Sequence, residues 1–212
     1  MASFDAVLFD FGGVFTPSPL HGLRTAAAGM GIPPEVAFAI VFGGYDEDTD
    51  HPWHRLERGE VPIEEALAAI TALGTEAGHE LDPIAMLTSG FGGSIIRDDV
   101  VALVREVRAA GLRTAMVTNN IKEFSSGWRS LLPVEELFDL VVDSSEEGVR
   151  KPDPRIFQVT LERLGGVAPE RAVFLDDAPG NVAAAKALGL HAIEVRADHV
   201  AAVEELRALL AA

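Results

Sequence analysis

The sequence predicts an α/β protein with a Rossmann-like parallel sheet, helices on both faces of that sheet and an inserted helical cap. Three observations indicate this fold. Short apolar runs alternate with segments of helical periodicity from residue 99 onward. Another apolar run opens the chain, and residues 17–93, which separate it from the others, show helical periodicity and no convincing strand. We therefore expect a core domain of residues 1–16 and 94–212 and a cap domain of residues 17–93.

The opening run, residues 6–9, is rich in Val, Leu and Phe and too short for a core helix. These features are typical of a strand that is buried on both faces of a parallel sheet. The run stops at Asp10, and Gly12 and Gly13 allow the backbone to turn sharply there. Asp10 could either cap this turn or face a ligand at the mouth of the sheet, and this stretch alone favours neither.

Within the expected cap, residues 62–70 illustrate the helical pattern. Pro62 stands in the first turn, acidic residues follow it directly, and apolar residues recur at helical spacing. Beyond the cap, strands and helices alternate. We expect strands over residues 113–118, 137–142, 172–175 and 191–195, and helices over residues 99–110, 121–132, 154–164, 181–188 and 200–210. Helices of this length between strands imply right-handed crossovers and a parallel sheet covered on both faces.

The chain is acidic, with 17 Lys and Arg against 33 Asp and Glu and a formal net charge of -16. Such a surface repels nucleic acid and anionic membranes, so we expect neither as a partner. It would also repel a phosphorylated substrate unless a local cation reversed the field. There is no cysteine, no export signal and no apolar run near the ~20 residues of a membrane span, so we expect a cytoplasmic protein. Nothing in the sequence indicates an oligomeric state.

Polar residues follow the carboxyl ends of the predicted strands, which lie at one edge of a parallel sheet. They are Asp10, the pair Thr118 and Asn119, Lys151 in the loop after the third strand, and the pair Asp176 and Asp177. Most have a structural alternative. Thr118 or Asn119 could cap a helix, Lys151 could be a solvated loop residue, and Asp177 could start the helix ahead of Pro179.

The adjacent carboxylates of Asp176 and Asp177 are harder to explain structurally, because they repel one another and Asp10 unless a cation is bound. Oxygen ligands without Cys or a His cluster favour a hard ion, and a phosphate nearby would favour Mg2+. A carboxylate can attack phosphorus, while Mg2+ and a lysine neutralise charge on the transferred group.

Four segments, taken together and in this order, resemble the motifs of the haloacid dehalogenase (HAD) superfamily. They are residues 9–14, 117–119, 151–152 and 174–177. The resemblance implies that Asp10 is the nucleophile, that Thr118, Asn119 and Lys151 bind the phosphoryl group, and that Asp10, the Gly12 carbonyl, Asp176 and Asp177 hold Mg2+. Within the superfamily the chain looks most like the capped phosphatases related to the amino-terminal domain of soluble epoxide hydrolase and to sugar-phosphate phosphatases. The resemblance therefore implies a Mg2+-dependent phosphatase that hydrolyses a small phosphorylated metabolite through an aspartyl phosphate on Asp10.

One departure from the resemblance concerns Gly12, where most phosphatases of this superfamily carry a second Asp as general acid. Such an acid is worth a factor of about 100 to 10,000 in rate. The candidate replacements are His21, Tyr45, His51 and His54 in the expected cap, although each could be an exposed loop residue.

Two other functions stay open: a metal-free 2-haloacid dehalogenase-type hydrolase, and a catalytically weak relative that only binds a phosphorylated ligand. The pair Asp176 and Asp177 counts against the first, and the retained Asp10 and Lys151 count against the second.

Overall fold

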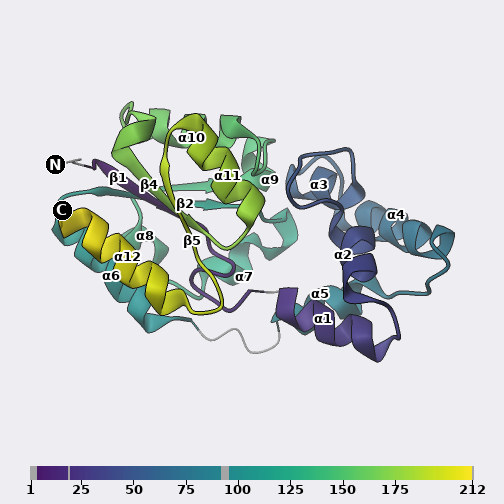
Figure 1. Ribbon diagram of the computed structural model, residues 1–212. Helices are drawn as coiled ribbons and strands as arrows, with labels where there is room; N and C mark the ends of the chain where they lie inside the picture. Colours follow the sequence, from purple (N-terminus) through teal and green to yellow (C-terminus); the bar gives the residue numbers. More distant parts are fainter. Residues whose placement is uncertain (1–3, 19, 92–95, 212) are drawn as a thin grey trace.

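The computed structural model describes residues 4–18, 20–91 and 96–211 and confirms the predicted α/β fold (Figure 1). Its described residues form a five-stranded parallel sheet with the order β3-β2-β1-β4-β5. The strands are β1 (Ala6–Phe9), β2 (Arg113–Thr118), β3 (Leu140–Asp143), β4 (Ala172–Asp176) and β5 (His191–Glu194). β1 lies at the centre, so Asp10 emerges between the ends of β2 and β4.

Helices cover both faces of the sheet because successive residues of each strand point to opposite sides. Val7 and Phe9 of β1 belong to the hydrophobic cluster that includes α6 (Asp98–Ala109) and α12 (His199–Ala211). Ala6 and Leu8 belong to the cluster on the other face, with α10 (Pro154–Arg163) and α11 (Pro179–Leu188). The unbroken apolar run of β1 is thus explained by burial on both faces.

A helical insert lies between β1 and α6 and gathers to one side of the sheet (Figure 1). Its described helices are α1 (Leu20–Gly29), α2 (Pro34–Phe42), α3 (Pro52–Glu57), α4 (Ile63–Glu76) and α5 (Pro83–Phe91). They pack around their own hydrophobic cluster, which Ile121 joins from the segment after β2. No strand occurs in the described part of the insert, as the sequence predicted.

Membrane-spanning potential is weak in the described helices. No single one is long and apolar enough to cross a bilayer, and only the bent pair Leu23–Gly29 and Pro34–Phe42, at 117°, passes by combined length and composition.

Two element boundaries differ from the sequence prediction. The third strand begins at Leu140 rather than at residue 137, because Leu137 ends the short helix α8 (Val134–Leu137). Leu137 and its neighbour Phe138 are apolar because both are buried in the core, not because they belong to the strand.

The single helix expected over residues 121–132 is instead the 3-10 turn η1 (Lys122–Phe124) followed by α7 (Ser125–Arg129). Ser125, Ser126 and Gly127 have low helix propensity and make up most of α7, which accordingly extends over only five residues. Two further short elements, α9 (Ser144–Glu147) and η2 (Pro169–Arg171), were not predicted.

Candidate active site

Asp10 directly follows the central strand and is fixed there by its backbone, whose N–H donates to the carbonyl of Leu175 at 2.9 Å. Its side chain is largely buried. The next loop turns at Gly13, where φ is +72°. Arg97 holds this loop in place, because its Nη1 donates to the carbonyl oxygens of Gly13 at 2.5 Å and Val14 at 3.0 Å.

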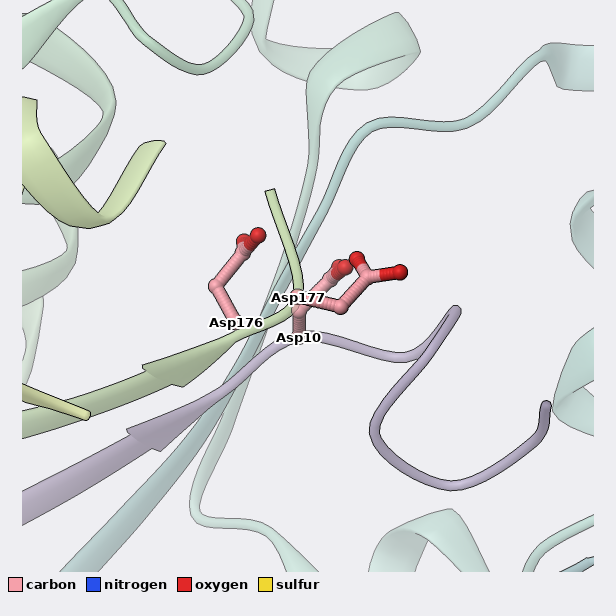
Figure 2. Close-up of side chains that lie close together, drawn as sticks. All are labelled: Asp10, Asp176 and Asp177. Atoms are coloured by element: carbon pink, nitrogen blue, oxygen red, sulfur yellow. The ribbon is translucent and has the colours of Figure 1, made fainter. Parts of the chain in front are cut away.

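Asp10, Asp176 and Asp177 lie together beyond the ends of β1 and β4 (Figure 2). One carboxylate oxygen from each lies within 4.8 Å of the others. Burial raises the pKa of the Asp10 carboxyl to about 8, and the charges of Asp176 and Asp177 add to the rise against the attraction of Lys151. Burial, followed by the charge of Asp176, raises the pKa of Asp177 to about 6. The site thus concentrates more negative charge than its own lysine offsets, which a bound cation would relieve.

Lys151 joins two of these carboxylates. Its Nζ lies 2.7 Å from Asp10 Oδ1 and 2.6 Å from Asp176 Oδ2, and the side chain is buried. Burial alone would lower the pKa of Lys151, but the two carboxylates outweigh it and raise that pKa above its ordinary value. Lys151 is therefore held as an ammonium beside the carboxylate that the sequence marks as the nucleophile.

The side chain of Asn119 positions this lysine. Its Oδ1 accepts from the backbone N–H of Lys151 at 2.8 Å, and its Nδ2 donates to the backbone carbonyl of Lys151 at 2.9 Å. A contact between Asn119 and a phosphoryl group would come from its backbone N–H or from the second N–H of Nδ2. The neighbouring Thr118 ends β2 with its hydroxyl in a long 3.5 Å contact to the carbonyl of Asn119, which leaves this hydroxyl weakly committed.

Asp176 is fully buried and already engaged on both oxygens. Besides Lys151, it accepts from the backbone N–H of Ala178 at 2.8 Å and from Asn181 Nδ2 at 3.1 Å to each oxygen. These hydrogen bonds hold the Asp176 carboxylate in place, and that carboxylate in turn positions the Lys151 ammonium. Sequence reasoning missed Asn181, although its place in the first turn of the helix that follows the two acids was a usable signal.

A cavity of about 600 Å³ lies between this edge of the sheet and the helical insert. The predicted site residues that line it are Asp10, Gly12, Thr118, Asn119, Lys151 and Asp177. Asp176 is not among its lining residues and lies behind Lys151. The structure thus brings together side chains that are more than 160 positions apart in the sequence.

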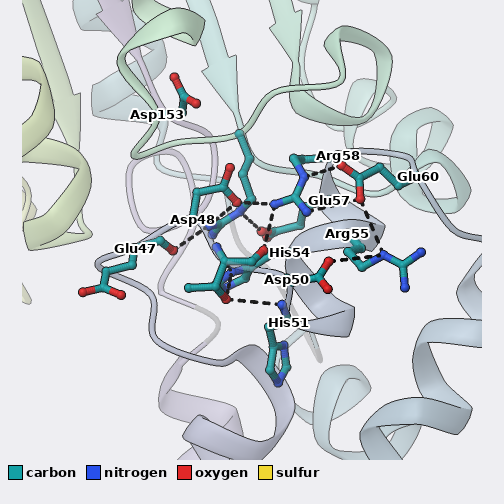
Figure 3. Close-up of polar contacts among 12 residues, drawn as sticks. Glu47, Asp48, Asp50, His51, His54, Arg55, Glu57, Arg58, Glu60 and Asp153 are labelled. Atoms are coloured by element: carbon teal, nitrogen blue, oxygen red, sulfur yellow. Dashed lines mark hydrogen bonds and ion pairs between the residues drawn. The ribbon is translucent and has the colours of Figure 1, made fainter.

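The four candidate acids of the insert differ in position. Tyr45 lines the cavity, and burial, together with the charge of Glu57, raises the pKa of its hydroxyl well above its ordinary value. His51 and His54 do not line the cavity (Figure 3). His51 Nδ1 accepts from the backbone N–H of Trp53 at 3.2 Å and caps α3, and His54 is buried with its Nδ1 accepting from the N–H of Thr49 at 3.0 Å. The side chain of His21 lies outside the described residues.

A buried ion pair, which was not predicted from the sequence, connects the insert to the strand ends. Arg150 Nε donates to Glu57 Oε2 at 2.7 Å, and the two side chains are 0% and 2% exposed. Arg150 Nη1 also donates to the carbonyl of Glu47 at 3.0 Å (Figure 3). The hydroxyl of Ser144 donates to the carbonyl of Glu57 at 2.6 Å. Because Arg150 precedes Lys151, this pair joins the insert directly to the edge of the sheet where the three carboxylates lie.

Comparisons with known proteins agree with this geometry. The family model for haloacid dehalogenase-like hydrolases matches residues 4–189. The chain is 38% identical over 98% of its length to mouse acyl-CoA dehydrogenase family member 10, but spans only 19% of that protein. It is 28% identical to the sesquiterpene phosphatase astK of Aspergillus oryzae, over 98% of this chain and 97% of that protein.

A solved dehalogenase structure in an intermediate complex shares the fold, with a TM-score of 0.69 and 19% identity over 100% of this chain and 99% of that one. The family match covers most of the sequence, including every strand end that contributes to the site. The chain is a hydrolase and belongs to the haloacid dehalogenase-like family.

Proposed function

We propose that this hydrolase is a Mg2+-dependent phosphatase that cleaves a small phosphorylated metabolite through an aspartyl phosphate on Asp10. The observation that carries the proposal is the cluster of three carboxylates within 4.8 Å of one another around the buried Lys151. The phosphatase relative, which is similar over nearly the full length of both chains, supports the same reaction class. In this proposal residues 1–16 and 94–212 form the catalytic core, and residues 17–93 form a cap over the site.

The donor set fits Mg2+. Carboxylate and carbonyl oxygens are the ligands that this ion prefers, and the pKa values of Asp10 and Asp177, raised first by burial and then by neighbouring carboxylates, are ones that a bound cation would lower. Asp10, Asp177 and the Gly12 carbonyl would hold the ion, with Asp176 as a further candidate beside them. When bound, Mg2+ would neutralise charge on the transferred phosphoryl group.

The residues of the chain account for both halves of the reaction. The Asp10 carboxylate attacks phosphorus, the bond from phosphorus to the ester oxygen breaks, and that oxygen takes a proton from solvent or from the Tyr45 hydroxyl as the alcohol leaves. Water then attacks the phosphorus of the acylphosphate, which releases inorganic phosphate and restores Asp10. Lys151 and the Thr118 hydroxyl donate to the phosphoryl oxygens throughout, and Asn119 and Asp176 keep Lys151 in position.

The test is the release of phosphate from 4-nitrophenyl phosphate and acetyl phosphate, with Mg2+ and with a chelator. We expect turnover only with Mg2+, and we expect Asp10→Asn to reduce it about 10,000-fold or more. The matched control is Asp50→Asn, because the Asp50 side chain is 95% exposed and does not line the cavity.

Two outcomes would favour the alternatives. Absence of Mg2+-dependent turnover by the unmodified protein on a broad phosphate panel would favour a relative that only binds its ligand. Release of halide from a 2-haloacid without metal would favour a dehalogenase. The clustered acids count against the dehalogenase, because attack on carbon with loss of a halide has no use for three carboxylates around one lysine.

A further inference from the structure

Apolar side chains form most of the wall of this cavity. Leu23, Phe42 and Trp53 contribute from the insert. Ile121, Trp128 and Leu131 contribute from the segment after β2. At about 600 Å³ the cavity has the size of a site for a whole small molecule, so there is room beyond the phosphate for most of an alcohol.

The apolar wall is continuous between the insert and the segment after β2. Leu23, Phe42, Trp53 and Ile121 are members of one hydrophobic cluster. The rings of Phe42 and Trp53 pack edge to face at 5.0 Å between centroids. A ligand between these walls would be desolvated on both sides, which rewards hydrocarbon and penalises polar groups left without partners.

The charged side chains around the cavity also favour an uncharged alcohol. Among its described lining residues the cationic side chain is Lys151, and two carboxylates already engage it. Glu57 and Glu123 also line the cavity. Arg150 lies behind Glu57 and is paired with it at 2.7 Å. A carboxylate or second phosphate on the alcohol would therefore find no unpaired cation here and would meet acidic side chains.

Resting on the proposed phosphatase function, we infer that the substrate is the phosphate monoester of an uncharged, predominantly hydrophobic alcohol. The phosphate lies at Asp10 and Lys151, and the hydrocarbon lies between Trp53 on the insert and Ile121 and Leu131 on the other wall. Phosphorylated acids, nucleotides and sugar bisphosphates fit this cavity poorly.

A series of n-alkyl phosphates from methyl to octyl tests the inference with the full chain and Mg2+. We expect kcat/KM to rise about fourfold with each methylene that enters the cavity. An ω-carboxyalkyl phosphate of the same length as the octyl ester should react at least about tenfold more slowly than that ester.

The possible results separate the inference from the proposed function. Turnover of 4-nitrophenyl phosphate with no dependence on chain length, or with equal use of the carboxylated ester, would overturn the hydrophobic substrate while leaving the phosphatase intact. Absence of Mg2+-dependent turnover on every ester would overturn both.

A pair of variants locates the effect in the cavity. Leu131 lines the cavity and is 47% exposed, so Leu131→Arg should fold and introduce a cation into the apolar wall. It should lower the ratio of octyl to ω-carboxyalkyl turnover at least about tenfold. Val200 on α12 is 44% exposed and does not line the cavity, so Val200→Arg should leave that ratio unchanged. An unchanged ratio in Leu131→Arg would count against the proposed position of the alcohol.

Discussion

Gly13 lies against Asp177, and its replacement by alanine should weaken Mg2+ binding at the proposed metal site. Gly13 has a φ of +72°, and a Cβ placed on it would overlap Cγ and Oδ2 of Asp177. The same Cβ would lie 2.6 Å from Asp177 Cβ. Rotation of the carboxylate alone cannot relieve a collision that includes Cβ, so either the loop or the start of the segment after β4 has to move.

The expected magnitudes follow from these two effects. Placing an L-residue in the left-handed region costs about 1–2 kcal/mol. In a chain of this size that corresponds to a fall in Tm of about 2–8 °C. Displacing Asp177 removes one of three clustered carboxylates. Losses in the environment of a bound metal typically reduce affinity about 10–100-fold, so the Mg2+ concentration that gives half-maximal activity should rise by at least that factor.

The assay is the rate of 4-nitrophenyl phosphate hydrolysis as a function of Mg2+ concentration, together with thermal unfolding. The matched control is Gly111→Ala, because Gly111 has a φ of +85° and its added Cβ would meet nothing within 4 Å. Both variants should lose the stability that the left-handed backbone costs, Gly13→Ala somewhat more because of the collision with Asp177, but only Gly13→Ala should require more Mg2+. If the two variants share the Mg2+ dependence of the unmodified protein, the assignment of Asp177 as a metal ligand is wrong.

Three further predictions concern the insert and the loop after β1. Glu57→Gln removes the carboxylate 2.7 Å from the buried Arg150 guanidinium and leaves it the longer 3.6 Å contact to Asp48, so unfolding experiments should show a loss of about 3 kcal/mol. The double variant Glu57→Leu with Arg150→Met should recover most of it, and a loss below about 1 kcal/mol in Glu57→Gln would contradict this account. Gly12→Asp should raise kcat more for octyl phosphate than for 4-nitrophenyl phosphate, because the poorer leaving group gains more from an acid, and an equal effect on both esters would refute the reasoning. Tyr45→Phe should lower kcat for octyl phosphate while sparing 4-nitrophenyl phosphate, and equal losses on both would exclude Tyr45 as the proton donor.

The sequence was sufficient for the sheet because its strands are buried on both faces. Such strands appear as short unbroken apolar runs, and the runs beginning at Ala6, Arg113 and Ala172 correspond closely to β1, β2 and β4. The clustering of Asp10, Lys151 and Asp176 could be anticipated for the same reason, since parallel strands present their carboxyl ends at one edge.

The features that the sequence did not predict depend on tertiary contacts. Leu137 and Phe138 look like strand residues because periodicity records burial and not backbone conformation. Glu57 and Arg150 are 93 positions apart, and each alone resembles an ordinary surface charge, so only the folded chain shows that they pair in the interior. His51 and His54 were reasonable candidate acids until the structure showed that their Nδ1 atoms serve backbone N–H groups within the insert.

The absence of an acidic side chain at Gly12 matters more if the substrate is hydrophobic, as the apolar cavity suggests. An aliphatic alcohol is a poor leaving group, so a hydrophobic substrate needs proton donation more than an aryl or acyl phosphate does. Tyr45 is a candidate for this donor, because it lines the cavity and its raised pKa keeps the hydroxyl protonated, although the same shift makes it a weaker acid. It belongs to the same insert as Phe42 and Trp53, so contacts with the hydrocarbon would bring the donor to the ester oxygen. Binding energy from the alcohol would then lower the barrier of the chemical step as well as stabilise the bound substrate. Longer alkyl chains should therefore raise kcat as well as lower KM.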